Sequence, residues 1–328
     1  MSRSLDTSLL AQMKKEDPRP AYESLSTLLS NLPESGLLEI EFLGYSHPLE
    51  SGLHFLQDGN AVAIPKLRLI QAFSVARQIL QAHLCSKTLK VPHSVVSACA
   101  ILLLMDPEHL TAANTRKRSL LDNDNLTEVT LRREKLFLDT LLTARLHRHT
   151  KSPTLWSHRR WLFLKSRELG IAWNVKQDVK DVIMTAAQRH PRNYVAWQHA
   201  RILLGSNPDL AEDLVDDVKE FCLRNHSDIS AWSFLSSCVT RIEDDERRQK
   251  TCSTLLAEIL SLTESFRWTN ESVWTFLRTI FATKTVSEEQ MKRFIAAIDK
   301  LYPGTTGDAF QQKTLDNARE WCNKYHVS

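Results

Sequence analysis

Apolar and polar residues along most of this chain recur with the period of an α-helix. The first clear example begins after Pro65, where one stripe is apolar and the other side carries Arg68, Arg77 and Gln78. The apolar stripe consists of Leu69, Ile70, Phe73, Ala76, Leu80 and Leu84. Similar patterns separated by short caps predict further helices, with ends good to ~2–4 residues. These helices cover about 93–105, 109–121, 128–149, 153–169, 174–190, 193–205, 209–225, 229–242, 246–264, 270–283, 287–302 and 309–325.

Residues 1–64 have a different pattern. Ala21–Leu32 predicts a short helix, whereas residues 36–43 and 52–56 predict extended segments, with a turn at Asp58 and Gly59. We therefore divide the chain into an N-terminal extension, residues 1–64, and a helical domain, residues 65–328. The extension is expected to cap the first helix of that domain.

A capping residue followed four positions later by Trp occurs four times. The pairs are Ser152 with Trp156, Asn193 with Trp197, Asp228 with Trp232, and Asn270 with Trp274. Ser, Asn and Asp side chains accept hydrogen bonds from the free N–H groups of a first helical turn, so each pair predicts a helix entrance. A degenerate fifth copy spans 106–117, with Ala113 at the Trp position.

The four tryptophans, at 156, 197, 232 and 274, are 41, 35 and 42 residues apart, the length of a helix hairpin with short connections. Such pairs bury their second faces by stacking on neighbours. The sequence therefore predicts an all-α fold, an α-solenoid of antiparallel helix hairpins forming a crescent. The tryptophans are expected to pack between helices. Arg159, Arg160 and Arg201 could pair with a neighbouring helix or with a partner chain.

The repeated stretch resembles the protein prenyltransferase alpha subunits, whose repeat reads Pro-x-Asn-Tyr-x-x-Trp-x-x-Arg-x. Residues 191–201 match it almost completely, and the similarity covers roughly 90–285. The stretches ending at Lys117 and Trp161 are most similar to one branch, the protein prenyltransferase alpha subunit repeat-containing proteins, alpha subunits of a third type of geranylgeranyltransferase. This resemblance implies that Trp156, Trp197, Trp232, Trp274, Arg160 and Arg201 are structural repeat residues.

Lys151 is the candidate catalytic residue. It directly precedes a helix start, where free N–H groups and the helix dipole favour an anion, although a Lys at such a place is often only solvated surface. The resemblance implies that Lys151 contacts the diphosphate of an isoprenoid donor and stabilises its developing charge, and that Asn193 and Tyr194 form part of the diphosphate-binding wall. The sequence departs from the family at Pro153, where Tyr is usual, and at Val195, where His is frequent.

Composition excludes several other classes. The net charge of +3 is too small to indicate nucleic-acid binding, and Arg116–Arg118 and Arg132–Arg133 are interpreted as solvated helix faces. There is no glycine-rich nucleotide loop. The six cysteines form no Cys-x-x-Cys pair, so a reducing, cytoplasmic location is expected. Cys222 and His226 could share a helix face as metal ligands, but a buried apolar Cys is the preferred interpretation. No segment predicts a membrane span.

The resemblance implies the alpha subunit of a heterodimeric protein prenyltransferase. Its expected partners are a beta subunit, a prenyl diphosphate, with geranylgeranyl as the implied donor, and an acceptor protein with a C-terminal cysteine. No metal is expected on this chain; zinc is expected on the beta subunit. The alternative is a non-catalytic helical-repeat adaptor. Tetratricopeptide repeats fit less well because their period is ~34 residues.

Overall fold

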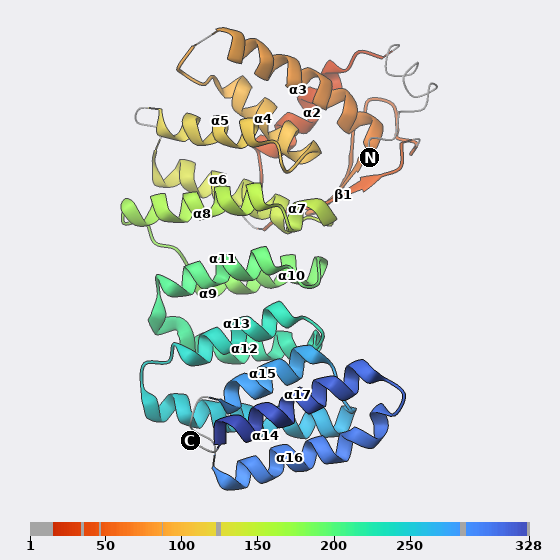
Figure 1. Ribbon diagram of the computed structural model, residues 1–328. Coiled ribbons are helices and arrows are strands. Elements are labelled where there is room, and N and C mark those ends of the chain that lie inside the picture. The colour runs from red at the N-terminus through yellow and green to blue at the C-terminus, as the bar shows by residue number, and fades with distance from the viewer. Residues whose placement is uncertain are drawn as a thin grey trace. The chain divides into compact units, whose positions relative to one another are not determined.

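The computed structural model describes residues 16–33, 36–45, 47–86, 88–122, 126–282 and 287–326, and is mostly helical (Figure 1). Residues 1–15 of the predicted N-terminal extension, and residue 283 at the predicted end of one helix, lie outside these ranges. The chain forms two compact units, Met1–Asn174 and Val175–Ser328, which we describe separately. The predominance of helix is confirmed. The crescent-shaped solenoid, which concerns both units together, and the domain boundary after residue 64 stay predictions.

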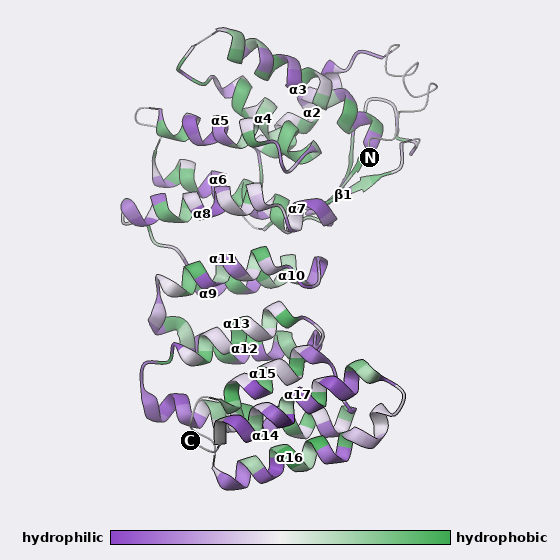
Figure 2. Cartoon of the chain, viewed as in Figure 1, coloured by the Kyte–Doolittle hydropathy of each residue, from purple (hydrophilic) through white to green (hydrophobic). Residues whose placement is uncertain are grey.

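The first unit combines a three-stranded sheet with helices. Its elements are α2 (Arg19–Ser30), β1 (Glu39–Leu43), β2 (Leu56–Asp58), β3 (Ala61–Pro65), α3 (Lys66–Ser86), α4 (His93–Met105), α5 (Leu110–Leu121), α6 (Glu128–Leu142), α7 (His147–Thr150) and α8 (Pro153–Glu168). Helix α2 packs on α3 and α4, α4 packs on α5, and α6 packs on α8. Along most of these helices hydrophobic residues are interspersed with hydrophilic ones (Figure 2).

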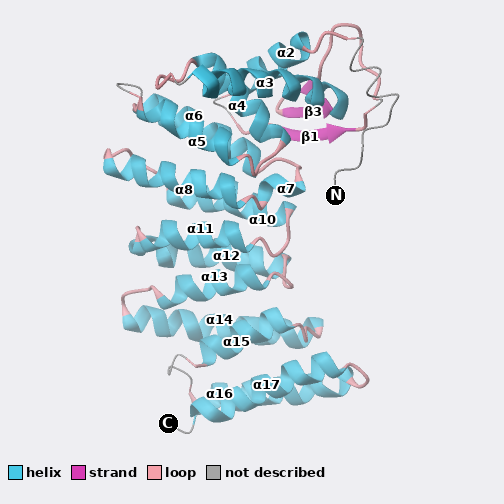
Figure 3. Ribbon diagram, turned by 45° about the horizontal axis from the view of Figure 1, so that its top comes forward, coloured by secondary structure: helices cyan, strands magenta, loops and turns pink. Residues whose placement is uncertain are grey.

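The sheet is the departure from an all-α fold (Figure 3). Its strand order is β1-β3-β2, with β3 parallel to β1 and antiparallel to β2. The predicted extended segment at 36–43 contains β1, but the second one, 52–56, only reaches the start of β2, and β3 was not predicted. The predicted turn is confirmed: Gly59 has φ +57° between β2 and β3, a conformation that glycine adopts readily.

The prediction of one continuous helix over 128–149 is wrong. Helix α6 ends at Leu142, and the short helix α7 begins only at His147. Between them the Arg145 N–H donates to the Ile40 carbonyl of β1 at 2.9 Å, and the Arg145 side chain lies 3.0 Å from the Glu39 carboxylate. The connection therefore follows the sheet edge, a tertiary contact that a local helical pattern does not contain.

The second unit contains helical elements only among its described residues. They are α9 (Val175–Asp178), a π-helical segment (Val179–Met184), α10 (Thr185–Arg189), α11 (Tyr194–Gly205), a short 3-10 turn (Pro208–Leu210), α12 (Ala211–Arg224), α13 (Ile229–Thr240), α14 (Asp245–Phe266), α15 (Glu271–Phe281), α16 (Glu288–Leu301), a second 3-10 turn (Tyr302–Thr305) and α17 (Ala309–His326). Helices α11, α13, α15 and α17 contact one another in succession, while α12 packs on α13 and α14 packs on α15 and α16. Within this unit the predicted helix boundaries agree with the structure to within a few residues.

No helix in the described part of the chain is long and apolar enough to cross a bilayer.

Candidate functional site

The predicted helix entrances are confirmed by their capping hydrogen bonds. The side-chain oxygens of Ser152, Asn193, Asp228 and Asn270 accept from the backbone N–H three residues ahead, at 3.1, 3.3, 3.1 and 3.4 Å respectively. In the degenerate copy the ring nitrogen Nδ1 of His109 accepts from the Ala112 N–H at 3.1 Å. Each cap satisfies a donor that the first helical turn leaves free.

The repeated tryptophans lie in the core. The exposed fractions of Trp156, Trp197, Trp232 and Trp274 are 2%, 0%, 1% and 1%. In three of them the indole N–H donates to the carbonyl six residues earlier, at 2.9 Å for Trp156, 3.0 Å for Trp232 and 2.9 Å for Trp274. This bond ties the loop before each cap to the helix that follows it.

Trp197 is the exception. Its indole N–H is buried without a hydrogen-bond partner among the described residues. The loop before its cap also differs, because Arg192 has φ +61° and its N–H donates to the Asp228 carboxylate at 2.9 Å. The repeat is therefore preserved in packing at Trp197 but not in this hydrogen bond.

Lys151 lies between α7 and α8, with an exposed side chain. No carboxylate pairs with it among the residues that the structure describes. The next residue, Ser152, is fully buried and donates to the Pro107 carbonyl at 3.0 Å. This bond anchors the α7–α8 junction to the loop between α4 and α5. Lys151 thus projects from a fixed backbone at a helix start, an arrangement that favours contact with an anion.

A carboxylate of the chain itself is also present at this entrance. The Thr154 hydroxyl, in the first turn of α8, donates to Glu108 Oε2 at 2.6 Å. Because a negative group near a helix N-terminus is stabilised by the dipole, an incoming anion at α8 competes with Glu108. Pro153, which replaces the usual family Tyr, supplies no N–H and no hydroxyl there.

Asn193 and Tyr194 belong to the second unit and differ in accessibility. Asn193 is 2% exposed. Its Oδ1 caps α11 and its Nδ2 lies 3.5 Å from the Ala186 carbonyl, so both polar atoms have contacts within the chain. Tyr194, the first residue of α11, is 69% exposed. Of these two residues only Tyr194 presents its side chain to an approaching ligand or partner.

The arginines after the tryptophans have three different environments. Arg160 is exposed on α8. Arg201 on α11 donates to Ser233 Oγ at 2.8 Å and to Ser237 Oγ at 3.3 Å, both on α13, so it joins two successive helices. Arg159 is fully buried and donates from Nε to Asp139 Oδ1 on α6 at 2.6 Å.

Arg116 corrects an interpretation made from the sequence. It was expected on a solvated face, but it is 7% exposed and its guanidinium donates to both oxygens of Glu134, at 2.9 and 2.6 Å. Arg116 follows Ala113 by three residues, as Arg159 follows Trp156, so both occupy one repeat position and both pair with a carboxylate on α6. Positions i and i+3 share a helix face, which is the signal that could have predicted the burial of Arg116.

His158 completes this buried cluster. Its Nε2 lies 3.4 Å from Glu134 Oε1. Burial lowers the pKa of His158 to about 3, against the smaller opposing effect of Glu134. Burial alone would raise the pKa of the Glu134 carboxyl, but the charges of Arg116 and His158 and the Arg116 hydrogen bonds together hold it below its ordinary value. Because its members are shielded from solvent, the cluster supports packing between α5, α6 and α8 and is not a site open to a substrate.

The cysteines are free thiols. Cys222 is fully buried, and burial raises its pKa well above the ordinary value. His226 stacks on Trp268, with ring centroids 5.0 Å apart, and its Nδ1 lies 2.6 Å from Asn270 Nδ2. No group of metal-ligating side chains was found among the described residues.

Comparisons with known proteins agree with the resemblance seen in the repeats. The ECM9 middle domain family matches residues 155–263. Protein prenyltransferase alpha subunit repeat-containing protein 1 of Homo sapiens is 31% identical over an alignment of 122 residues that covers 32% of this chain and 28% of that protein. The Danio rerio protein of the same name is 31% identical over an alignment of 125 residues that covers 32% of this chain and 27% of that protein.

A longer similarity extends beyond the repeat core. Protein prenyltransferase alpha subunit repeat-containing protein 1-B of Xenopus laevis is 26% identical over an alignment of 258 residues that covers 71% of this chain and 54% of that protein. The chain therefore spans between about a quarter and about half of the length of these relatives. The predicted similarity to the protein prenyltransferase alpha subunit repeat-containing proteins is confirmed.

Proposed function

We propose that this chain is the alpha subunit of a heterodimeric protein prenyltransferase. The complex transfers an isoprenoid, geranylgeranyl in this proposal, from its diphosphate to a cysteine near the C-terminus of an acceptor protein. The observation that carries the proposal is Lys151, which is exposed at the start of α8 and has no carboxylate partner among the described residues. A cation held there by a buried anchor, Ser152, can stabilise charge on a departing diphosphate.

The partner supplies the remaining chemistry in this proposal. A beta subunit holds the zinc ion that activates the acceptor thiolate and the apolar site for the isoprenoid. The exposed Tyr194 contributes to the wall around the diphosphate, and Asn193 holds the start of α11 in position. The complex works in the cytoplasm, in keeping with free thiols on this chain.

A non-catalytic adaptor is the second candidate, and two observations favour it. Both polar atoms of Asn193 have contacts within the chain, and Glu108 lies at the entrance of α8 that a diphosphate would approach. An adaptor would retain the capped, Trp-packed helices without needing an accessible anion site. The two functions share a fold and differ in whether Lys151 has a chemical role.

Co-expression with prenyltransferase beta subunits tests the proposal. The chain is expressed with each beta subunit, the complex is isolated by size exclusion, and transfer of labelled geranylgeranyl diphosphate to a protein with a C-terminal cysteine is measured. A complex that transfers label supports the enzyme. A stable complex without transfer supports the adaptor, and the absence of any complex contradicts the alpha-subunit assignment.

A further inference from the structure

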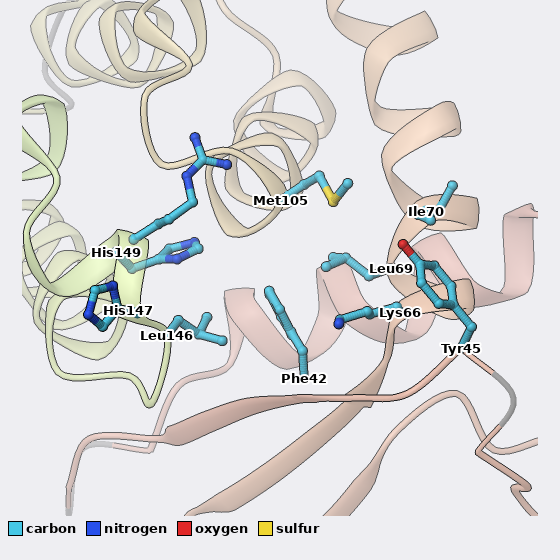
Figure 4. A pocket seen from close by; sticks show the side chains of 10 residues that line it. Phe42, Tyr45, Lys66, Leu69, Ile70, Met105, Leu146, His147 and His149 are labelled. Carbon is cyan, nitrogen blue, oxygen red and sulfur yellow. The ribbon is translucent and has the colours of Figure 1, made fainter. Parts of the chain in front are cut away.

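A cavity of about 290 Å³ lies within the first unit, beside β1 (Figure 4). It is open to solvent on one side and is lined by β1, the first turn of α3, the end of α4 and the segment that forms α7. The side chains that line it are Phe42, Tyr45, Lys66, Leu69, Ile70, Met105, Leu146, His147, Arg148 and His149. The Arg145 N–H bond to Ile40 fixes the α7 segment against β1 and so holds one wall in place. The volume is near the lower end of that of small-molecule sites, roughly 300 Å³.

The charged side chains that line the cavity are both basic. Lys66 and Arg148 line it, and none of the lining residues is Asp or Glu. Arg148 pairs with Asp106 at 3.0 Å, whereas Lys66 lies over the Tyr45 ring, 5.6 Å from its centroid, and has no carboxylate partner among the described residues. An unpaired cation next to apolar walls attracts a ligand that combines an anionic group with an apolar body.

His149 is held against the end of α4 by its ring nitrogen Nε2. Its Nε2 lies 3.1 Å from the Leu103 carbonyl and 2.9 Å from the Leu104 carbonyl. Both are acceptors at the C-terminal end of α4, so Nε2 carries the proton. Burial lowers the pKa of His149 to about 4, which keeps the ring neutral near pH 7. Its Nδ1 is therefore a lone-pair acceptor, buried without a partner among the described residues.

Figure 4 shows Leu146 and His149 on one side of the cavity and Lys66, Leu69 and Tyr45 on the other. Phe42 also packs near His149, with ring centroids 6.3 Å apart. A ligand held between these walls can place its apolar body against Phe42 and Leu69 and its anionic group near Lys66.

We propose that this cavity binds a small organic anion, a carboxylate or a phosphate, whose charged group lies near Lys66 and whose apolar body lies against Phe42 and Leu69. The proposal does not depend on the prenyltransferase assignment, because it concerns a separate set of residues.

Calorimetric titration of the full chain with matched probes tests it. N-acetyl-L-phenylalanine has the carboxylate and the aromatic body; its carboxamide lacks the charge, and 3-phenylpropionate keeps the charge and the aromatic body without the acetamido group. We expect N-acetyl-L-phenylalanine to bind with a Kd of about 1 mM or lower. The carboxamide should bind at least about tenfold more weakly, whereas 3-phenylpropionate, which keeps the carboxylate and the apolar body, should bind comparably. 2-Phenylethyl phosphate is compared with 3-phenylpropionate, which has a similar apolar body and a carboxylate in place of the phosphate. The anion that binds more tightly identifies the preferred charged group.

Two variants locate the binding. Lys66→Gln should weaken the binding of all three anions by about tenfold and leave that of the carboxamide unchanged. Lys90→Gln, at an exposed lysine that does not line the cavity, should have no effect. The proposal is overturned if none of the three anions binds at about 10 mM, or if Lys66→Gln and Lys90→Gln reduce the affinity for the anions equally.

Discussion

Arg159 on α8 and Asp139 on α6 form a buried ion pair with 2.6 Å between Nε and Oδ1. Their exposed fractions are 0% and 3%. At the equivalent repeat positions of α11, α13 and α15 the residues are Ala200, Leu235 and Leu277, all fully buried. One repeat position is thus filled by an arginine with a carboxylate partner in the first unit and by an aliphatic side chain in the second.

Breaking this pair should destabilise the first unit strongly. Arg159→Met leaves Asp139 buried with Lys135 as its remaining cation, 2.5 Å away, and we expect a loss of about 3 kcal/mol in the free energy of unfolding. Urea unfolding followed by circular dichroism measures this. The adjacent, exposed Arg160→Met is the matched control and should change stability by less than about 0.5 kcal/mol. The double variant Arg159→Met, Asp139→Leu should recover most of the loss, because both buried charges are removed and Lys135, whose side chain is 28% exposed, remains solvated. Equal stability of the Arg159→Met and Arg160→Met variants would contradict this account.

The tryptophan hydrogen bonds predict a difference between two repeats. Trp232→Phe removes the bond to the His226 carbonyl, whereas Trp197→Phe removes a buried N–H that has no partner in the described structure. Both changes delete similar volume, so the hydrogen bond should make Trp232→Phe the more destabilising by about 1 kcal/mol. Thermal unfolding of the two variants measures the difference. If Trp197→Phe costs as much as Trp232→Phe, the indole N–H bond has no net effect.

The features predicted well from the sequence are those that local residues determine. A capping side chain, the Trp four positions later and a periodic apolar stripe lie within one helix, so Asn193 with Trp197 and Asp228 with Trp232 marked helix starts that the structure confirms. Strand β3 was missed although Val62 and Ile64 are buried in alternation. The five residues of β3 directly precede the apolar helical pattern of α3, so the boundary between strand and helix could not be recognised from the sequence.

The features that were missed depend on contacts between distant residues. Arg116 is buried with Glu134, on the next helix, as its ion-pair partner. Its repeat position indicates the buried face, but a charged run does not identify the partner. The helix predicted over 128–149 stops because the Arg145 N–H meets Ile40 of β1. The cavity beside β1 combines four segments that lie far apart in the chain, so no single stretch of sequence indicates it.

Thiol reactivity should distinguish one cysteine from the others. Cys85 is exposed. Burial raises the pKa of Cys99 and Cys238 to about 12 and that of Cys322 to about 11. Because the thiolate is the reactive form, iodoacetamide at pH 8 should modify Cys85 in the folded chain, and mass spectrometry of the digested protein reads out the sites. Unfolding in urea should expose the rest. Modification of Cys99 in the folded chain at the rate of Cys85 would contradict its burial.

Stability should fall in mild acid partly through His158. The pKa of this ring is lowered to about 3 from 6.5, so between these values the unfolded chain binds a proton that the folded chain does not. The contribution of neutral His158 to the free energy of unfolding is fully present above pH 6.5. It decreases by about 1.4 kcal/mol per pH unit as the pH falls toward 3. His158→Gln removes this proton uptake, so its free energy of unfolding should decrease about 1.4 kcal/mol less than that of the unchanged protein between pH 6 and pH 5. Parallel pH profiles for the two proteins would show that His158 does not titrate on unfolding.

Lys151 provides the test that separates the two proposed functions. Lys151→Ala removes an exposed cation that has no carboxylate partner among the described residues, so the melting temperature and assembly with a beta subunit should not change. If Lys151 stabilises charge on the departing diphosphate, turnover of the complex should fall by about 10²-fold. Lys165→Ala on the same helix, where Lys165 pairs with Glu168 at 2.5 Å, is the matched control and should leave turnover unchanged. An active complex that loses no turnover on Lys151→Ala would exclude the catalytic role of this lysine, and the fixed α7–α8 junction would then serve packing alone.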